Sequence, residues 1–115
     1  MDSGELSERT KKFAVQVIKF VEGLEQSLST LVLSKQIIRS ATSIGANDRA
    51  ACGARSRAEF IAKLQIAREG SDETLYWLEI FQEINNRYKL RDLMQECDEL
   101  TAILTASIKT SRAQQ

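Results

Sequence analysis

The chain has 115 residues, with sixteen basic and sixteen acidic side chains, a length that suits one domain with a modest hydrophobic core. Because the charges cancel, no overall field attracts nucleic acid or an anionic membrane. Histidine is absent, which removes the commonest general base and the commonest transition-metal ligand.

The composition predicts a single all-α domain spanning residues 1–115. Proline is absent, glycine occurs only five times, and Ala, Leu, Glu, Lys, Arg and Gln are frequent. No apolar run approaches the ~18 residues of a membrane-spanning helix, and the N-terminal segment lacks the apolar core of a signal peptide. We therefore expect a cytoplasmic protein that has no membrane partner.

The first helix is predicted at about residues 7–26. Phe13, Val17, Phe20 and Leu24 follow one another at steps of four, three and four, which places them on one helix face. Ser7 is the predicted N-cap of this helix.

The second helix, at about residues 30–53, carries an apolar face and, beside it, a polar stripe. The apolar face holds Leu33, Ile37, Ala41 and Ile44, and the stripe holds Gln36, Ser40, Ser43 and Asn47. A buried hydroxyl or amide without a partner costs ~1–3 kcal/mol, so the stripe needs hydrogen bonds. It forms either a network between helices of one chain or a contact with a second subunit, and Ser40, Ser43 and Asn47 are candidate interface residues. Gly45, inside this helix, predicts close approach of a neighbouring helix.

The third helix, at about residues 57–85, has the clearest start. Ser56 and Glu59 have the spacing of a capping box. The apolar band that follows is wider than one bundle core requires. Phe60, Leu64, Leu78 and Phe81 are expected in the core, whereas Trp77, Ile80 and Ile84 are candidate residues of a subunit interface.

The fourth helix is predicted at about residues 89–110, after a turn at residues 85–89. Its apolar positions include Leu90, Leu93, Cys97, Leu100 and Leu104. Four helices with short connections indicate an antiparallel up-down-up-down four-helix bundle.

Candidate chemical groups are few. Cys52 and Cys97 do not have metal-binding spacing, and each is expected to be a small buried side chain. Glu69, Asp72 and Glu73 could bring carboxylates together on one helix, but they lack the Glu-x-x-His pairs of a di-iron bundle, and a solvated acidic face is favoured. We expect no catalytic, metal or cofactor-binding residues and no small-molecule substrate.

Basic residues concentrate in one segment. Residues 35–68 contain seven basic and two acidic side chains, and this excess indicates either solvated helix faces, which are favoured, or an anion-binding patch. The candidate nucleic-acid contacts are Arg49, Arg55, Arg57, Lys63 and Arg68. No aromatic side chains for base stacking are interleaved with them, so any RNA would be bound through its phosphates.

The segment 41–78, "ATSIGANDRAACGARSRAEFIAKLQIAREGSDETLYWL", resembles a known family. The similar features are Ser43–Asn47, Ser56-Arg57 with Phe60, and the groups around Lys63–Ala67 and Glu73–Leu78. They resemble the four-helix-bundle proteins encoded in intervening sequences of bacterial 23S ribosomal RNA genes, the S23 family.

The resemblance implies an oligomeric binding or scaffolding protein without enzymatic activity. Related proteins form homopentameric rings, so a bacterial homopentamer is expected. The accessory variability determinants of diversity-generating retroelements belong to the same superfamily and engage a reverse transcriptase and nucleic acid. RNA or a ribonucleoprotein is therefore an alternative partner to a second copy of the chain.

Overall fold

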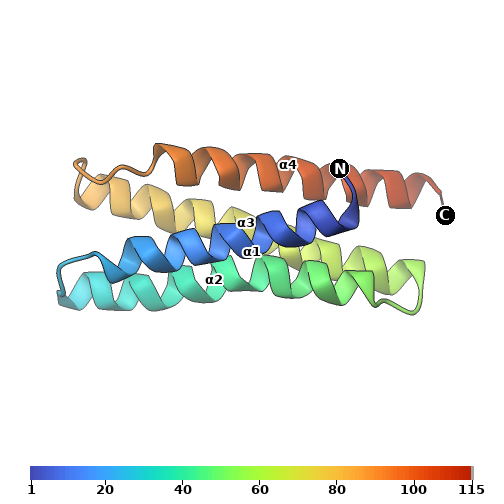
Figure 1. Cartoon of the computed structure of the whole chain (residues 1–115), viewed down its shortest axis with the longest axis horizontal. Helices are drawn as coiled ribbons and strands as arrows, with labels where there is room; N and C mark the ends of the chain where they lie inside the picture. Colours follow the sequence, from blue (N-terminus) through green and yellow to red (C-terminus); the bar gives the residue numbers. More distant parts are fainter. Residues whose placement is uncertain (115) are drawn as a thin grey trace.

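Four α-helices make up most of the chain in the computed structural model, which describes residues 1–114. They are α1 (Ser3–Glu22), α2 (Leu28–Cys52), α3 (Arg57–Ile84) and α4 (Arg91–Ala113), and the described residues contain no strand. The helices lie side by side in a bundle that measures 47 × 20 × 20 Å (Figure 1). The backbones of α1 and α3 each lie against both α2 and α4 but not against each other. Side chains of α1 and α3 meet in the core, where the Phe20 and Phe81 ring centroids lie 5.3 Å apart. The protein is thus an all-helical bundle.

The loops divide between the two ends of this bundle. Residues 23–27 and 85–90 lie at one end, and the loop at residues 53–56 lies at the other (Figure 1). We call these the two-loop end and the single-loop end. The C-terminus also lies at the single-loop end (Figure 1).

Helix α1 begins and ends about four residues earlier than the predicted 7–26. Its N-cap is Asp2, whose carboxylate accepts a 2.8 Å hydrogen bond from the Glu5 backbone N–H, so the prediction of Ser7 was wrong. Ser7 instead lies inside the helix, where its carbonyl accepts from the Thr10 hydroxyl. The helix ends at Glu22, before Gly23.

Helix α2 begins at Leu28 rather than near Thr30. Ser27 and Thr30 form a capping box, in which each side chain accepts from the backbone N–H of the other. Thr rather than Glu or Gln at the third position obscured this signal. At α3 the prediction of Ser56 as N-cap is confirmed, although Glu59 accepts from the backbone N–H of Arg55 rather than that of Ser56.

Helix α4 is shifted towards the C-terminus relative to the predicted 89–110. It begins at Arg91, after a buried Leu90 that makes no side-chain cap, and it ends at Ala113. Residues 111–113 therefore extend the helix by almost one turn beyond the predicted end.

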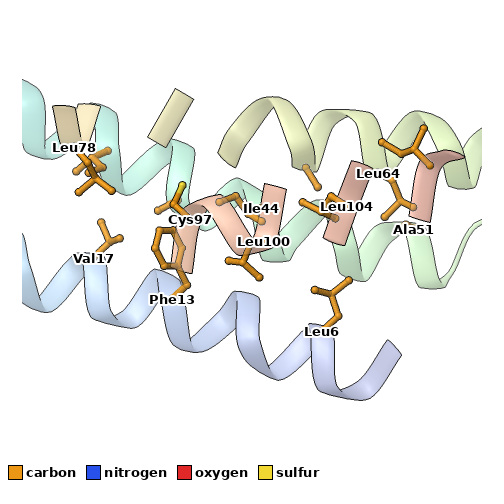
Figure 2. Packing of buried hydrophobic residues seen from close by; sticks show 14 of the residues in the cluster. Leu6, Phe13, Val17, Ile44, Ala51, Leu64, Leu78, Cys97, Leu100 and Leu104 are labelled. Carbon is orange, nitrogen blue, oxygen red and sulfur yellow. The ribbon is translucent and has the colours of Figure 1, made fainter. Parts of the chain in front are cut away.

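Apolar side chains from every helix form one continuous core (Figure 2). Phe13 and Val17 of α1 point inward towards Leu78, Cys97 and Leu100 (Figure 2). Burial of each large side chain contributes about 1.5–3 kcal/mol, so this cluster is the main source of stability.

Among the predicted core residues of α3, Leu64, Leu78 and Phe81 are buried. Phe60 is only half-buried, and its neighbour Ile61 lies in the core instead. Cys97 is buried as expected, but Cys52 is exposed, so its predicted burial was wrong.

A layer of hydroxyl groups crosses this core. The hydroxyls of Ser40 in α2 and Thr74 in α3 lie 2.8 Å apart. Further along, Ser71 of α3 bonds Thr101 of α4 at 2.7 Å, and the Cys97 thiol donates to the Ser71 carbonyl. Each pair satisfies polar groups that would otherwise be buried without partners, and together they tie α2 to α3 and α3 to α4.

Close backbone packing accompanies this layer. A Cβ atom on Gly70 would lie 2.5 Å from the Ser43 hydroxyl oxygen and 3.2 Å from the Ser40 carbonyl oxygen. A Cβ atom on Gly45 would lie 3.1 Å from the hydroxyl oxygen of Thr10 on α1, so the predicted close approach at Gly45 is confirmed. Glycine at these two positions lets the helices approach closely.

Candidate subunit and nucleic-acid interfaces

The polar stripe of α2 faces α3 of the same chain. Ser40 is 0% exposed and bonds Thr74, so it cannot contact a second subunit in this fold. The Ser43 hydroxyl donates to the Ser40 carbonyl at 2.7 Å, and the Asn47 amide donates to the Ser43 carbonyl at 2.9 Å. Ser40 thus fits the first interpretation, a bond between helices of one chain, whereas the bonds of Ser43 and Asn47 stay within α2. Ser43 and Asn47 remain half-exposed.

Trp77 lies on the outer side of α3, near α2. Its indole N–H donates to the Glu73 carboxylate at 3.0 Å, and the same carboxylate pairs with the guanidinium of Arg39 on α2. The Tyr76 ring meets the Trp77 ring edge-on at a centroid distance of 5.1 Å. Arg39, Glu73 and Trp77 therefore form a hydrogen-bonded cluster at the surface, and the Trp77 side chain is half-exposed.

Large apolar side chains are exposed mainly towards the two-loop end. Leu28 is 82% exposed, and Leu31 and Val32 in the next turn of α2 are also exposed. At the end of α3, Ile84 is 50% exposed and Ile80 is half-buried. Leu28 and Val32 border one shallow hollow on α2, and Leu31 borders another between α1 and α2. The third-helix interface candidates thus lie where other apolar groups reach the surface.

The five candidate nucleic-acid contacts do not form one patch. Arg49 borders a groove between α1 and α2, and Arg55 is exposed in the loop at the single-loop end. Lys63 is half-buried on α3. Arg57 donates to the Ser111 carbonyl and the Gln114 side chain at the end of α4, and Arg68 borders a separate groove between α3 and α4.

This groove, which we call the α3–α4 groove, is basic. It has a volume of about 130 Å³ and is lined by Gln65, Arg68, Thr105, Ile108, Lys109 and Arg112. Among residues 1–114, no acidic side chain lines it, and the Nε atom of Arg68 is buried without a hydrogen-bond partner. Three cations with an unsatisfied donor favour an anion, which would supply the missing acceptor.

The carboxylates of α3 do not converge on a metal site. Glu69 and Asp72 are exposed, and Glu73 is engaged by Arg39 and Trp77. Within residues 1–114, no group of three metal-ligating side chains is close enough to hold a metal ion. Over the same residues, no helix is both long and apolar enough to cross a membrane.

The buried thiol has an unreactive environment. Burial, followed by the negative charges of Asp98 and Asp72, raises the pKa of Cys97 to about 12. The thiol is therefore protonated at neutral pH and serves as a hydrogen-bond donor to Ser71.

Comparison with known proteins gives this architecture a family. The family model described as 23S rRNA-intervening sequence protein matches residues 4–106. The chain belongs to this family. A crystal structure of a protein with unknown function from the S23 ribosomal protein family of Bacteroides thetaiotaomicron VPI-5482 matches with a TM-score of 0.86 and 36% identity, covering 95% of this chain and 99% of that chain. Comparison with curated proteins gave no match.

Part of the basic groove lies outside the segment matched by the intervening-sequence family. Arg57 and Arg68 fall within residues 4–106, whereas Lys109 and Arg112 follow it. Both α4 residues were missed because basic side chains were counted along the chain, and Arg112 also lies beyond the predicted helix end at residue 110. In the fold, α3 packs against α4, and this packing brings Lys109 and Arg112 near Arg57 and Arg68.

Proposed function

We propose that this member of the intervening-sequence family is a non-catalytic, cytoplasmic protein that assembles into a homo-oligomer, a pentamer, and acts as a binding or scaffold protein. The observation that carries the proposal is the set of large apolar side chains left exposed on a small bundle, with Leu28 82% and Tyr76 55% exposed. Contiguous apolar surface on a soluble protein marks an interaction site.

The distribution of these side chains suits a ring. Val15 is exposed on α1 and Tyr76 on α3, and the backbones of these two helices do not lie against each other. Apolar groups thus occupy different sides of the bundle. A closed ring needs two different surfaces that meet head to tail, whereas a two-fold dimer needs only one.

The proposed helix order is antiparallel up-down-up-down. The alternation of loops between the two ends supports it, and so does the separation of the α1 and α3 backbones (Figure 1). In this order, the start of α2 and the end of α3 lie at the same end, which would join Leu28 and Val32 with Ile84 into one apolar surface.

Introducing a charged side chain into this apolar surface would test the assembly. Val32→Lys and Ile84→Lys should each lower the sedimentation coefficient towards that of a monomer, because each puts an unpaired charge into an apolar contact. Ala102→Lys is the matched control, since Ala102 is exposed on α4, where no large apolar side chain is exposed among the described residues. Assembly that survives both α2 and α3 variants would contradict this interface.

A second candidate function is binding of RNA or a ribonucleoprotein, as in the accessory proteins of diversity-generating retroelements. The α3–α4 groove supports it, because Arg68, Lys109 and Arg112 line it, no described acidic side chain lines it, and Arg57 reaches the same end of α4. Contacts of this kind are made to phosphates and do not read sequence.

Binding of a structured RNA, measured by electrophoretic mobility shift, would test this candidate. The shift should weaken steeply as salt rises, because phosphate contacts release counterions. Arg112→Glu with Lys109→Glu should abolish the shift, whereas Lys89→Glu, in the loop at the opposite end, should change it little. No shift at low salt would remove the RNA candidate and leave the assembly proposal intact.

A further inference from the structure

Asp48 is a buried carboxyl group near the C-terminal end of α2. Asp48 is only 3% exposed, and its Oδ2 atom is buried without a hydrogen-bond partner. The ion pairs formed among residues 1–114 involve Arg9 and Arg39, not Asp48. A buried carboxylate without a partner is costly, so this one needs an explanation.

The carboxyl group lies in the wall of a cavity where all four helices meet. The cavity has a volume of about 150 Å³. Leu6 of α1, Phe60 and Leu64 of α3, and Ile103 of α4 form apolar walls, with Leu6 and Leu64 at the right of Figure 2. Asp48 of α2 and the Ser107 hydroxyl of α4 add two acceptor groups. Met1, Asp2 and Ser3, which are exposed, also line the cavity and bring a second carboxylate and a second hydroxyl.

We propose that this cavity is a binding site for a small primary aliphatic ammonium ion. The Asp48 carboxylate and the Ser107 hydroxyl would accept N–H bonds from the ammonium group, and the apolar walls would cover its alkyl chain. Cavities of about 150 Å³ accept a molecule as large as benzene, so butylammonium fits the available space. The site is separate from the proposed assembly and RNA surfaces and does not depend on either.

The chemistry of the cavity selects this class of ligand. An uncharged ligand leaves the carboxylate without a counter-charge, and an anion would be repelled by it. An ammonium group supplies three hydrogen-bond donors and a positive charge. It would pair with the buried Asp48 carboxylate, where little water screens the attraction between the two charges. Burial raises the pKa of Asp48, and a bound cation would oppose that shift.

Isothermal titration calorimetry of the full chain with butylammonium chloride tests the site, with sodium chloride at equal ionic strength as the control titrant. Saturable binding is expected, with butanol at least about tenfold weaker, because a charge-assisted hydrogen bond is worth about 1.5–3 kcal/mol. Asp48→Asn, which keeps the shape and removes the charge, should weaken butylammonium about tenfold or more and leave butanol unchanged.

A second readout uses only the wild-type chain. Butylammonium should shift the methyl NMR signals of Leu6, Leu64 and Ile103, and it should leave those of the distant Leu28 and Val32 unchanged. The proposal is overturned if butylammonium shows no saturable binding, if butanol binds equally well, or if the shifted signals lie elsewhere. It is also overturned if folded Asp48→Asn binds butylammonium as tightly as wild type does.

Discussion

The hydroxyl of Ser40 on α2 hydrogen-bonds the hydroxyl of Thr74 on α3 at 2.8 Å, with both side chains fully buried. Each hydroxyl also bonds a carbonyl of its own helix, Thr74 that of Gly70 at 2.7 Å and Ser40 that of Ile37 at 3.3 Å. This pair joins α2 to α3 near Gly70, whose missing side chain lets the two helices approach closely.

Removal of one partner should destabilise the bundle. Ser40→Ala leaves the Thr74 hydroxyl without its interhelical hydrogen-bond partner and should lower the free energy of unfolding by about 1 kcal/mol. Urea denaturation followed by circular dichroism measures this change. Thr42→Ala is the matched control, because the Thr42 hydroxyl is exposed and bonds only carbonyls of its own helix. Equal losses in the two variants would contradict a special role for the interhelical bond.

Gly70→Ala should destabilise the protein even though Ala is the better helix former. The added Cβ would lie 2.5 Å from the Ser43 hydroxyl oxygen, and relief of such a clash costs about 1–3 kcal/mol. This cost outweighs the gain of up to about 1 kcal/mol from helix propensity.

Thermal unfolding measures this balance. The double variant Gly70→Ala with Ser43→Ala removes the closest atom and should recover part of the lost stability. Recovery should be incomplete, because the Ser40 carbonyl oxygen would still lie 3.2 Å from the new Cβ. A more stable Gly70→Ala single variant would show that the helices separate easily at this contact.

Asp48 should make stability depend on pH. Burial raises the pKa of Asp48 above its ordinary value of 3.8, so the folded state favours the protonated form. Its stabilising contribution is complete below that ordinary value and is lost as pH rises through the folded-state pKa. Asp48→Asn stays neutral and should therefore be more stable than wild type at about pH 7, with the advantage shrinking towards about pH 4.

Urea unfolding of both proteins at the two pH values gives this difference directly. Glu8→Gln, at an exposed position on α1, controls for the loss of one surface charge. An advantage of Asp48→Asn that grows as pH falls would contradict the direction of the pKa shift.

The repetitive features of the sequence predicted the fold well. The step of four from Phe13 to Val17, and the alternating steps of three and four that lead from Leu64 to Leu78, indicate which helix face is buried, because an apolar stripe must meet a core. The S23-type residues between Ser43 and Leu78 pointed to the family, and the family match over residues 4–106 confirms it.

Features that depend on which helices meet were harder to predict. The stripe of Ser40, Ser43 and Asn47 looks the same in sequence whether it faces a helix of its own chain or another subunit. The basic groove needs cations from α3 and α4, which lie about 40 residues apart in the sequence, as Arg68 and Lys109 do. The burial of Asp48 is likewise set by its neighbours on other helices, not by its own surroundings in the chain.

The mass of the wild-type protein in solution tests the proposed assembly most directly. Light scattering on the purified chain at micromolar concentration should give about five times the monomer mass of 12.9 kDa, because apolar side chains on different sides of the bundle would be covered in a ring. A single species of 12.9 kDa that persists as the concentration rises would contradict the proposal.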